Sequence, residues 1–242
     1  MLALAIDSSG DTCALALGDG SELLAEYHFR HRMDLLRRIV PNINRLLSDC
    51  AKDVRDLDGV VVSVGPGSFT GLRIGVTVAK TLAYVLGKRI VGVGTLDAMA
   101  RAAAVQPAEE HQTTGDDVIC PMIFARANEV YWSIFDASGT GRLAECAVST
   151  VDEALSAIER MGGRARFVGA GARRNWEAIS SRLGGSASLC DRWADFARGA
   201  ALLELGLARL NAGDADDALA LAPLYIRKPT PVLRLESGRL DA

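Results

Sequence analysis

A glycine-rich segment directly after a short apolar run constrains the fold more than any other feature of the chain. The apolar run, residues 60–64, has the length of a buried strand, and residues 65–75 then contain four glycines and one proline. Glycine has no Cβ, so such a segment lets backbone N–H groups converge on an anion, or lets another stretch of chain approach closely. The pattern predicts an α/β protein in which a buried strand leads into a glycine loop and then into a helix.

Two common phosphate-binding loops do not match this segment. A Walker A loop has a lysine directly after its last glycine, whereas the first lysine after Gly65 is Lys80. The dinucleotide fingerprint is GxGxxG, but Gly65, Gly67 and Gly71 are spaced GxGxxxG, and no acidic residue follows about twenty positions on. Neither pattern therefore predicts a nucleotide at the glycine loop.

The composition is that of a globular protein without a broad nucleic-acid-binding surface. The 242 residues are 49% hydrophobic, enough for one large core or two small ones, and the formal net charge is −3. Five cysteines are scattered without CxxC spacing, so we predict no disulfide framework, no metal site and no cofactor. No basic stretch precedes the N-terminal apolar residues and no run of about 18 apolar residues occurs, so we expect no membrane contact and a cytoplasmic location.

The chain shows signs of an internal duplication. Residues 2–6 and 13–17 are typical of a hairpin followed by a third strand around residues 23–27, and residues 121–135 and 143–148 repeat this pattern. A polar, turn-rich stretch, residues 106–117, lies between the two patterns. We therefore predict an N-terminal half, residues 1–105, with the glycine loop; a C-terminal half, residues 118–222; and a tail, residues 223–242.

Several segments together resemble the TsaB family of bacterial proteins, which take part in threonylcarbamoyladenosine synthesis on tRNA. The similarity extends over roughly residues 2–228 and is most specific in the glycine loop. The other matching segments are residues 4–9, 13–17, 91–96, 125–132 and 223–227. The resemblance implies an α/β fold of the actin-like type, shared by sugar kinases, Hsp70 and actin, with two βββαβα-type halves.

The resemblance also implies a function. TsaB proteins are non-catalytic subunits needed with TsaD and the ATPase TsaE for transfer of the threonylcarbamoyl group to adenosine next to the anticodon of tRNA. We accordingly expect a heterodimer with the catalytic paralogue TsaD and contact with tRNA only through partners. The sequence leaves open whether the isolated chain is a monomer or a homodimer.

The competing hypothesis is an enzyme. An autonomous sugar-kinase-like ATPase would use Asp7, which ends the first predicted strand, together with the glycine loop. In the second half, however, Phe124 stands where TsaB relatives usually have Asp, and an aromatic ring cannot hold a metal-bound water. A degenerate peptidase is a third hypothesis, but His28, His31 and His111 form no HExxH motif. We assign no catalytic residue, and we interpret Asp7 as capping the turn that follows it.

Two apolar helices are the predicted contact surface. Residues 33–50 form an apolar stripe on a helix that we expect to be interrupted near Pro41, and residues 70–86 form a helix that is apolar on more than one side. Sequence alone does not decide whether both faces are core or one meets a partner, and the resemblance favours a partner. The predicted partner-helix residues are Leu36, Ile39, Val40, Ile43, Leu47, Val76, Lys80 and Ala83. The predicted loop residues at the assembly surface are Gly65, Pro66, Gly67, Ser68, Phe69, Thr70, Gly71 and Arg73.

Overall fold

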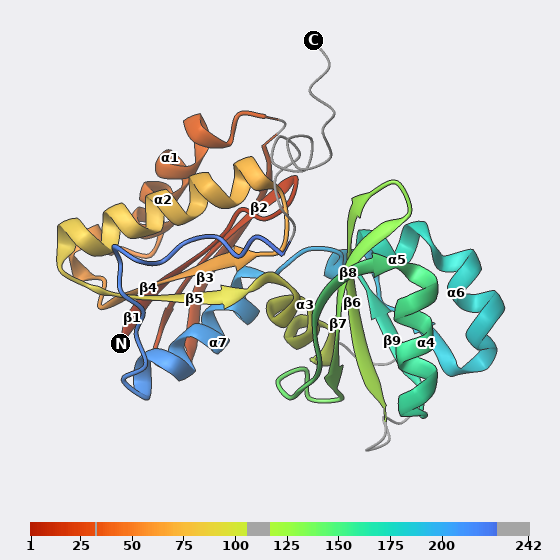
Figure 1. Ribbon diagram of the computed structural model, residues 1–242. Helices are drawn as coiled ribbons and strands as arrows, with labels where there is room; N and C mark the ends of the chain where they lie inside the picture. Colours follow the sequence, from red (N-terminus) through yellow and green to blue (C-terminus); the bar gives the residue numbers. More distant parts are fainter. Residues whose placement is uncertain (32, 106–116, 227–242) are drawn as a thin grey trace, which may run out of the picture.

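The computed structural model describes residues 1–31, 33–105 and 117–226, which contain two five-stranded sheets lying side by side (Figure 1). The strands of the first sheet are β1 (Leu2–Asp7), β2 (Thr12–Asp19), β3 (Glu22–Arg30), β4 (Gly59–Gly65) and β5 (Arg89–Gly94). They lie in the order β3-β2-β1-β4-β5; β2 is antiparallel to both β1 and β3, while β4 runs parallel to β1 and β5 parallel to β4. The predicted strand before the glycine loop is therefore confirmed as β4.

Two helices cover one face of the first sheet. They are α1 (Leu35–Asp49) and α2 (Phe69–Leu86), and a short 3-10 helix, η1 (Val54–Asp56), joins α1 to β4. Alternate residues of the strands, such as Leu4, Ile6 and Val62, form an apolar core with the two helices. The predicted interruption near Pro41 is wrong, because α1 runs through Pro41 as one helix. By length and composition alone α2 could cross a membrane, but it packs on β4 beside α1.

The second sheet repeats the topology of the first. Its strands are β6 (Val118–Arg126), β7 (Glu129–Asp136), β8 (Arg142–Thr150), β9 (Ala165–Val168) and β10 (Ala187–Leu189), in the order β8-β7-β6-β9-β10. β6, β7 and β8 form an antiparallel meander, and β9 and β10 continue it parallel to β6. Each sheet thus has a meander followed by two parallel strands, which confirms the predicted duplicated fold of the actin-like type.

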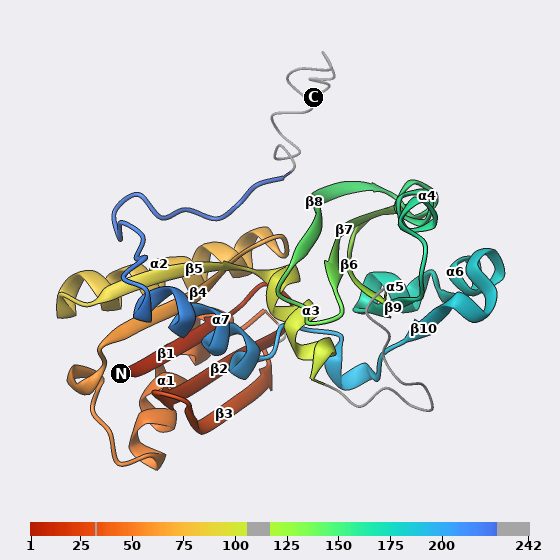
Figure 2. The same ribbon diagram turned by 90° about the horizontal axis from the view of Figure 1, so that it is seen from below.

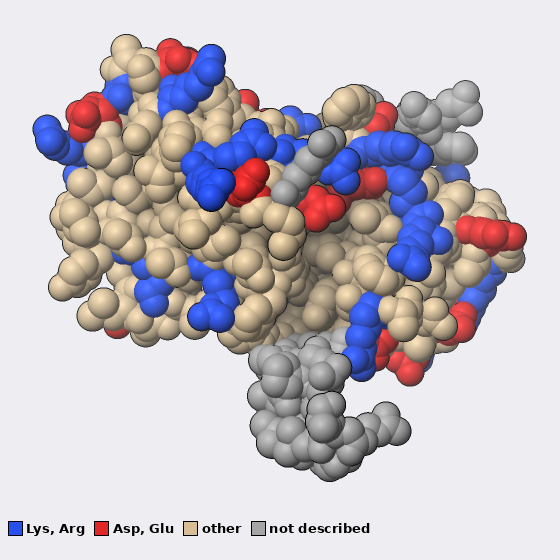
Figure 3. Space-filling view, turned by 90° about the horizontal axis from the view of Figure 1, so that it is seen from above, with Lys and Arg blue, Asp and Glu red and all other residues tan. Residues whose placement is uncertain are grey.

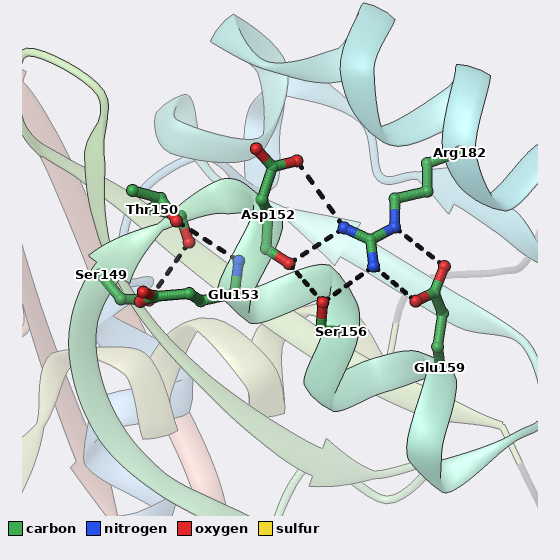
Figure 4. Close-up of polar contacts among 7 residues, drawn as sticks. All are labelled: Ser149, Thr150, Asp152, Glu153, Ser156, Glu159 and Arg182. Atoms are coloured by element: carbon green, nitrogen blue, oxygen red, sulfur yellow. Dashed lines mark hydrogen bonds and ion pairs between the residues drawn. The ribbon is translucent and has the colours of Figure 1, made fainter.

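The remaining helices complete the second half and the junction. They are α3 (Thr95–Ala104), α4 (Val151–Met161), α5 (Ala170–Arg174), α6 (Trp176–Leu183) and α7 (Gly199–Asn211), with 3-10 helices η2 (Gly184–Ser186) and η3 (Arg192–Ala194). After β9 the chain forms two short helices, α5 and α6, which meet at Asn175. Figure 4 shows how α6 is held to α4: Arg182 binds both carboxylate oxygens of Glu159, the hydroxyl of Ser156 and the carbonyl of Asp152.

Helix α7 follows the second sheet in sequence but packs on the first. It contacts β1, β2, β4 and β5 on the face opposite α1 and α2, and it also contacts α3 (Figure 2). The approach is close, because a Cβ on Gly206 would lie 2.3 Å from the methyl groups of Val61. α3 in turn packs on β6, so that residues of both sheets share one apolar core. The division at residues 105 and 118 and the tail from residue 223 remain predictions.

After α7 the chain returns along the outer edge of the first sheet. We call residues 212–226 the C-terminal strap. Asp216 accepts a hydrogen bond from the backbone N–H of Gly92 at 2.7 Å and bridges to Ile90 in β5. Farther along, the ammonium group of Lys80 donates to the carbonyls of Leu219 and Leu221, at 3.0 and 2.8 Å. The strap therefore covers β5, the edge strand of the first sheet, and reaches the glycine loop.

Candidate functional site

The glycine loop lies against the turn between β1 and β2. A Cβ on Gly71 would be 2.1 Å from the carbonyl oxygen of Ser8, and a Cβ on Gly67 would be 2.4 Å from that of Ser9. A Cβ on Gly75, one turn farther along α2, would be equally close to the hydroxyl oxygen of Ser8, at 2.0 Å. Side chains at these positions would overlap the turn, so the glycines are needed for contact with the chain itself.

The polar groups of the loop are also used within the chain. The N–H of Ser68 donates to the carbonyl of Ser9 at 2.6 Å, and the hydroxyl of Ser8 donates to the carbonyl of Gly71 at 2.8 Å. The hydroxyl of Ser68 caps α2 by accepting the N–H of Gly71 at 3.2 Å. An anion bound here would have to break these bonds and separate the loop from the turn.

Asp7, the acidic residue predicted near the loop, is fully buried. Its Oδ1 accepts the N–H of Ser9 at 3.3 Å, while its Oδ2 has no hydrogen-bond partner among the described residues. The buried hydroxyl of Ser63, on the adjacent strand β4, also lacks a described partner. Burial raises the pKa of Asp7, and the nearby polar groups of Ser63 and Ser9 only partly oppose this. Burial therefore disfavours the charged form of this carboxyl group.

The corresponding position in the second half carries no acid. The ring of Phe124 lies under the guanidinium of Arg174, with 4.4 Å between the guanidinium carbon and the ring centroid. Phe124 follows Ile123, which pairs with Tyr131 in the β6–β7 hairpin as Ile6 pairs with Leu15 in the β1–β2 hairpin. The two hairpins therefore do not present a pair of acidic residues to one phosphate group.

His28 and His31, the two histidines that the structure describes, have partners within the chain. His28 lies in strand β3, where its Nε2 is 2.9 Å from Glu26, and its ring meets Phe196 edge to face. Burial alone would raise the pKa of Glu26, but hydrogen bonds from His28, Arg198 and the backbone of Ala200 outweigh it and lower the pKa to about 2. Nε2 of His31 lies 2.9 Å from the carbonyl of Gly10. Within the described ranges no three His, Cys, Asp or Glu residues are grouped as metal ligands.

The predicted loop residues divide into two sets. Gly65, Pro66 and Gly71 are buried and Gly67 is half-buried, so these residues contact the chain itself, and their place at an assembly surface stays a prediction. Ser68, Phe69, Thr70 and Arg73 are exposed and stay candidates for that surface. The exposed set lies at the start of α2 because the first helical turn rotates away from the β1–β2 turn.

The predicted partner-helix residues also divide. Ile39, Ile43, Leu47, Val76 and Ala83 are at most 3% exposed and belong to the core between α1, α2 and the first sheet, so they face the chain's own sheet, and their assignment to a partner surface stays a prediction. Leu36 and Val40 remain exposed on α1. Lys80 is held by the C-terminal strap. Helical spacing could not separate these sets, because a stripe facing the chain's own sheet and one facing a partner have the same period.

Two exposed residues of the C-terminal strap lie beside the loop, and sequence analysis did not place them there. The ring of Tyr225 lies 5.1 Å from the ring of Phe69, and the N–H of Leu224 donates to the carbonyl of Val64 at 2.6 Å. The guanidinium of Arg73 also lies over the ring of Phe69, at 5.3 Å. The sequence of this segment shows a family resemblance, but it has no local pattern that indicates a return to the glycine loop.

Comparison with known proteins agrees with the fold and the loop. A family model described as "TsaD: tRNA N6-adenosine threonylcarbamoyltransferase" matches residues 32–180, more than half of the chain. The tRNA threonylcarbamoyladenosine biosynthesis protein TsaB of Bacillus subtilis is 37% identical over 135 residues, covering 56% of this chain and 55% of that protein. TsaB of Escherichia coli is 31% identical over 141 residues, covering 58% of each. The chain thus spans little more than half the length of these curated relatives.

A solved structure extends the similarity of fold to nearly the whole chain. The crystal structure of an uncharacterized protein with similarity to peptidase YeaZ from Pseudomonas aeruginosa has a TM-score of 0.78 and is 23% identical, covering 93% of this chain and 99% of that one. The match of residues 32–180 includes α1, the glycine loop, α2 and the β6–β7 hairpin, but not the β1–β2 turn or the C-terminal strap. The chain therefore belongs to the family of TsaD, tRNA N6-adenosine threonylcarbamoyltransferase, and its relatives include TsaB proteins.

Proposed function

We propose that this chain is a non-catalytic TsaB-type subunit of the machinery that adds the threonylcarbamoyl group to adenosine next to the anticodon of tRNA. It would act in the cytoplasm with a TsaD subunit, which carries the chemistry, and with the ATPase TsaE. The relatives named TsaB and the TsaD family match support the pathway. The geometry of the loop and the turn supports the non-catalytic role.

The main support for a non-catalytic role is the close contact between the glycine loop and the β1–β2 turn. At the β1–β2 turn, where an ATPase of this fold would need room for phosphate, Gly67 and Gly71 leave no gap between the loop and the turn. The N–H of Ser68, which could otherwise bind phosphate, already binds Ser9. Asp7 is buried with a raised pKa, and Phe124 occupies the matching position of the second half. Transfer of a phosphoryl group needs positioned charge around the phosphate, and these residues do not supply it.

Reconstitution tests the proposal. Threonylcarbamoyl transfer to unmodified tRNA would be measured with TsaD and TsaE, with and without the full chain, and ATP hydrolysis would be measured for the chain alone. We expect transfer only in the complete mixture and no hydrolysis by the isolated chain. Equal transfer without the chain, or ATP turnover by the chain alone, would refute the non-catalytic subunit.

The exposed side of α2 is the expected docking surface. Between Phe69 and Leu86 the only charged residues are Arg73 and Lys80, and Lys80 is bound to the C-terminal strap. Tyr84 and Val85, on the last turn, are 67% and 73% exposed, and α1 beside it exposes Leu36. An uncharged, partly apolar helix face of this kind is typical of helix–helix association between subunits.

Val85→Glu is expected to weaken association with TsaD at least tenfold, because docking would bury an unpaired carboxylate. The monomer should keep its stability, since Val85 is exposed, and this distinguishes the variant from Val76→Asp, which would disrupt the core. Size-exclusion chromatography with light scattering, together with titration calorimetry, would measure the assembly. Thr81→Glu, one turn earlier on the exposed side, maps the extent of the surface. Wild-type affinity for both variants would place the docking surface elsewhere.

A further inference from the structure

We propose that the end of the molecule at which the parallel strands of both sheets terminate binds the phosphate backbone of RNA directly. The inference rests on the proposed function only for the identity of the RNA, which is then tRNA. It departs from the expectation that this chain meets tRNA only through partners. Three arginines from three different helices carry it: Arg38 of α1, Arg73 of α2 and Arg174 of α5.

Each of these three arginines lies over an aromatic ring. Arg38 lies over Phe29 at 4.7 Å, Arg73 over Phe69 at 5.3 Å and Arg174 over Phe124 at 4.4 Å, measured from the guanidinium carbon to the ring centroid. Phe29 and Phe124 lie near the ends of β3 and β6, and Phe69 begins the helix that follows β4. Stacking fixes the plane of a guanidinium but leaves its N–H groups available.

The three stacked arginines also lack acidic partners. In the part of the chain that the structure describes, none of them lies within 4.0 Å of a carboxylate oxygen, and Arg38 donates only to the carbonyl of Arg30. Six arginines elsewhere in the chain are instead bound to carboxylates. Those with a carboxylate bound at 3.0 Å or less are Arg101, Arg142, Arg173, Arg182, Arg198 and Arg209. Arg89, Arg160 and Arg192 likewise have no carboxylate within 4.0 Å among the described residues, so what sets Arg38, Arg73 and Arg174 apart is the aromatic ring beneath each guanidinium together with the missing acidic partner.

Other residues add to this positive end. Arg37 is exposed, and Arg30 faces Asp11 across 3.7 Å with both side chains largely in solvent, so their attraction is weak. Arg126, at the end of β6, is paired with Glu129. Figure 3 looks onto this side of the molecule, where Lys and Arg atoms lie on both halves around a hollow, with some Asp and Glu atoms among them.

The arrangement favours RNA over a small anion or an acidic protein. Guanidinium groups on three separate helices suit a ligand with several phosphates, and a nucleic acid presents a phosphate to each. Phe69 and Tyr225 stack with each other beside Arg73 and are 45% and 44% exposed. Exposed aromatic rings between arginines are the surfaces on which unpaired bases stack, and such bases occur in the loops of tRNA.

The test compares two triple variants of the full chain. Arg38→Gln, Arg73→Gln and Arg174→Gln together remove the stacked arginines. Arg45→Gln, Arg55→Gln and Arg160→Gln together remove the same charge from residues near the opposite ends of α1, β4 and α4. Binding of fluorescently labelled, unmodified tRNA would be measured by anisotropy at several salt concentrations, after circular dichroism has established that each variant is folded.

We expect the first triple variant to bind tRNA at least tenfold more weakly than the wild type. Its slope of log K against log salt should fall by about 2, because each lost phosphate contact contributes about 0.7–0.9 to that slope. The control variant should keep most of the affinity. A threefold Arg→Lys variant, which keeps charge but not flat stacking, should keep most of the slope.

Several outcomes would overturn the inference. Equal losses in the two triple variants would mean that only net charge matters, and no tRNA binding by the wild type would exclude direct contact. Loss of TsaD binding with unchanged tRNA binding would assign the arginines to a protein interface. Reconstituted transfer separates this from the proposed function: transfer without binding by this chain refutes the RNA surface alone, whereas binding without transfer refutes the proposed function alone.

Discussion

Replacing Gly71 by alanine is expected to lower the free energy of unfolding by about 3 kcal/mol. The new Cβ would lie 2.1 Å from the carbonyl oxygen of Ser8, and that oxygen belongs to the buried β1–β2 turn, which cannot move without shifting Asp7 and β1. Alanine alone would favour the helix by up to about 1 kcal/mol, so the measured loss is a lower limit for the cost of the overlap. Urea unfolding followed by far-ultraviolet circular dichroism would measure it.

Gly10→Ala is the matched control for this substitution. Gly10 lies in the same turn, but a Cβ there would meet nothing within 4 Å, and its backbone is not in the left-handed region. We expect its stability to stay within about 0.5 kcal/mol of the wild type. If Gly71→Ala were as mild as Gly10→Ala, the glycine loop would not be held against the turn, and it could open to admit a ligand.

A second readout shows how far the damage spreads. All three tryptophans, Trp132, Trp176 and Trp193, lie in the second half of the chain, whereas Gly71 lies in the first. Because α7 and α3 join the two sheets through one apolar core, we expect tryptophan fluorescence and circular dichroism to report the same unfolding midpoint. Separate midpoints would mean that the halves unfold independently.

The fold is largely predictable from sequence because it is repeated. The same apolar pattern of a meander occurs twice along the chain, and each meander is followed by a strand that pairs in parallel with its first strand. The path of the chain after residue 183 is harder to predict from sequence. Helix α7 and the C-terminal strap pack on the first sheet through contacts between residues more than 100 positions apart, such as Lys80 with Leu219 and Leu221. Local sequence patterns do not predict contacts over such separations.

The sequence predicts that another group approaches the glycine loop closely, but it does not predict which group. Glycines at positions 67, 71 and 75 signal that something approaches the backbone closely, yet the signal is the same for a phosphate, another protein or a turn of the same chain. The structure identifies Ser8 and Ser9 as the approaching groups. Similarly, the sequence repeat shows that Phe124 stands where the first half has Asp7, but its contact with Arg174 depends on the packing of α5 against β6.

Asp7→Asn is expected to remove a pH dependence of stability that the wild type shows. Because burial raises the pKa of Asp7 above its ordinary value of 3.8, the folded state holds a proton that the unfolded state releases. This carboxyl group therefore contributes full stability below the unfolded pKa. Its contribution falls by about 1.4 kcal/mol per pH unit as pH rises from there to the folded pKa, and then stays constant.

Asparagine keeps the shape of the side chain and the acceptor for the N–H of Ser9, but it carries no titrating proton. The variant should therefore gain stability relative to the wild type as pH rises from the unfolded to the folded pKa of Asp7. Urea unfolding of both proteins from about pH 5 to about pH 9 would measure the difference. Parallel curves would show that Asp7 is ionised in the folded state at all these pH values.

The same variant tests the chemical role of Asp7. A carboxylate that positioned a metal ion or an attacking group would lose its function on conversion to the amide, whereas a buried, protonated carboxyl group has no such function to lose. We expect reconstituted threonylcarbamoyl transfer with Asp7→Asn to stay within about twofold of the wild type, since rate changes of that size correspond to less than about 0.5 kcal/mol. Increased stability together with abolished transfer would mean that the buried carboxyl group is strained for catalysis, and the chain would then be an enzyme.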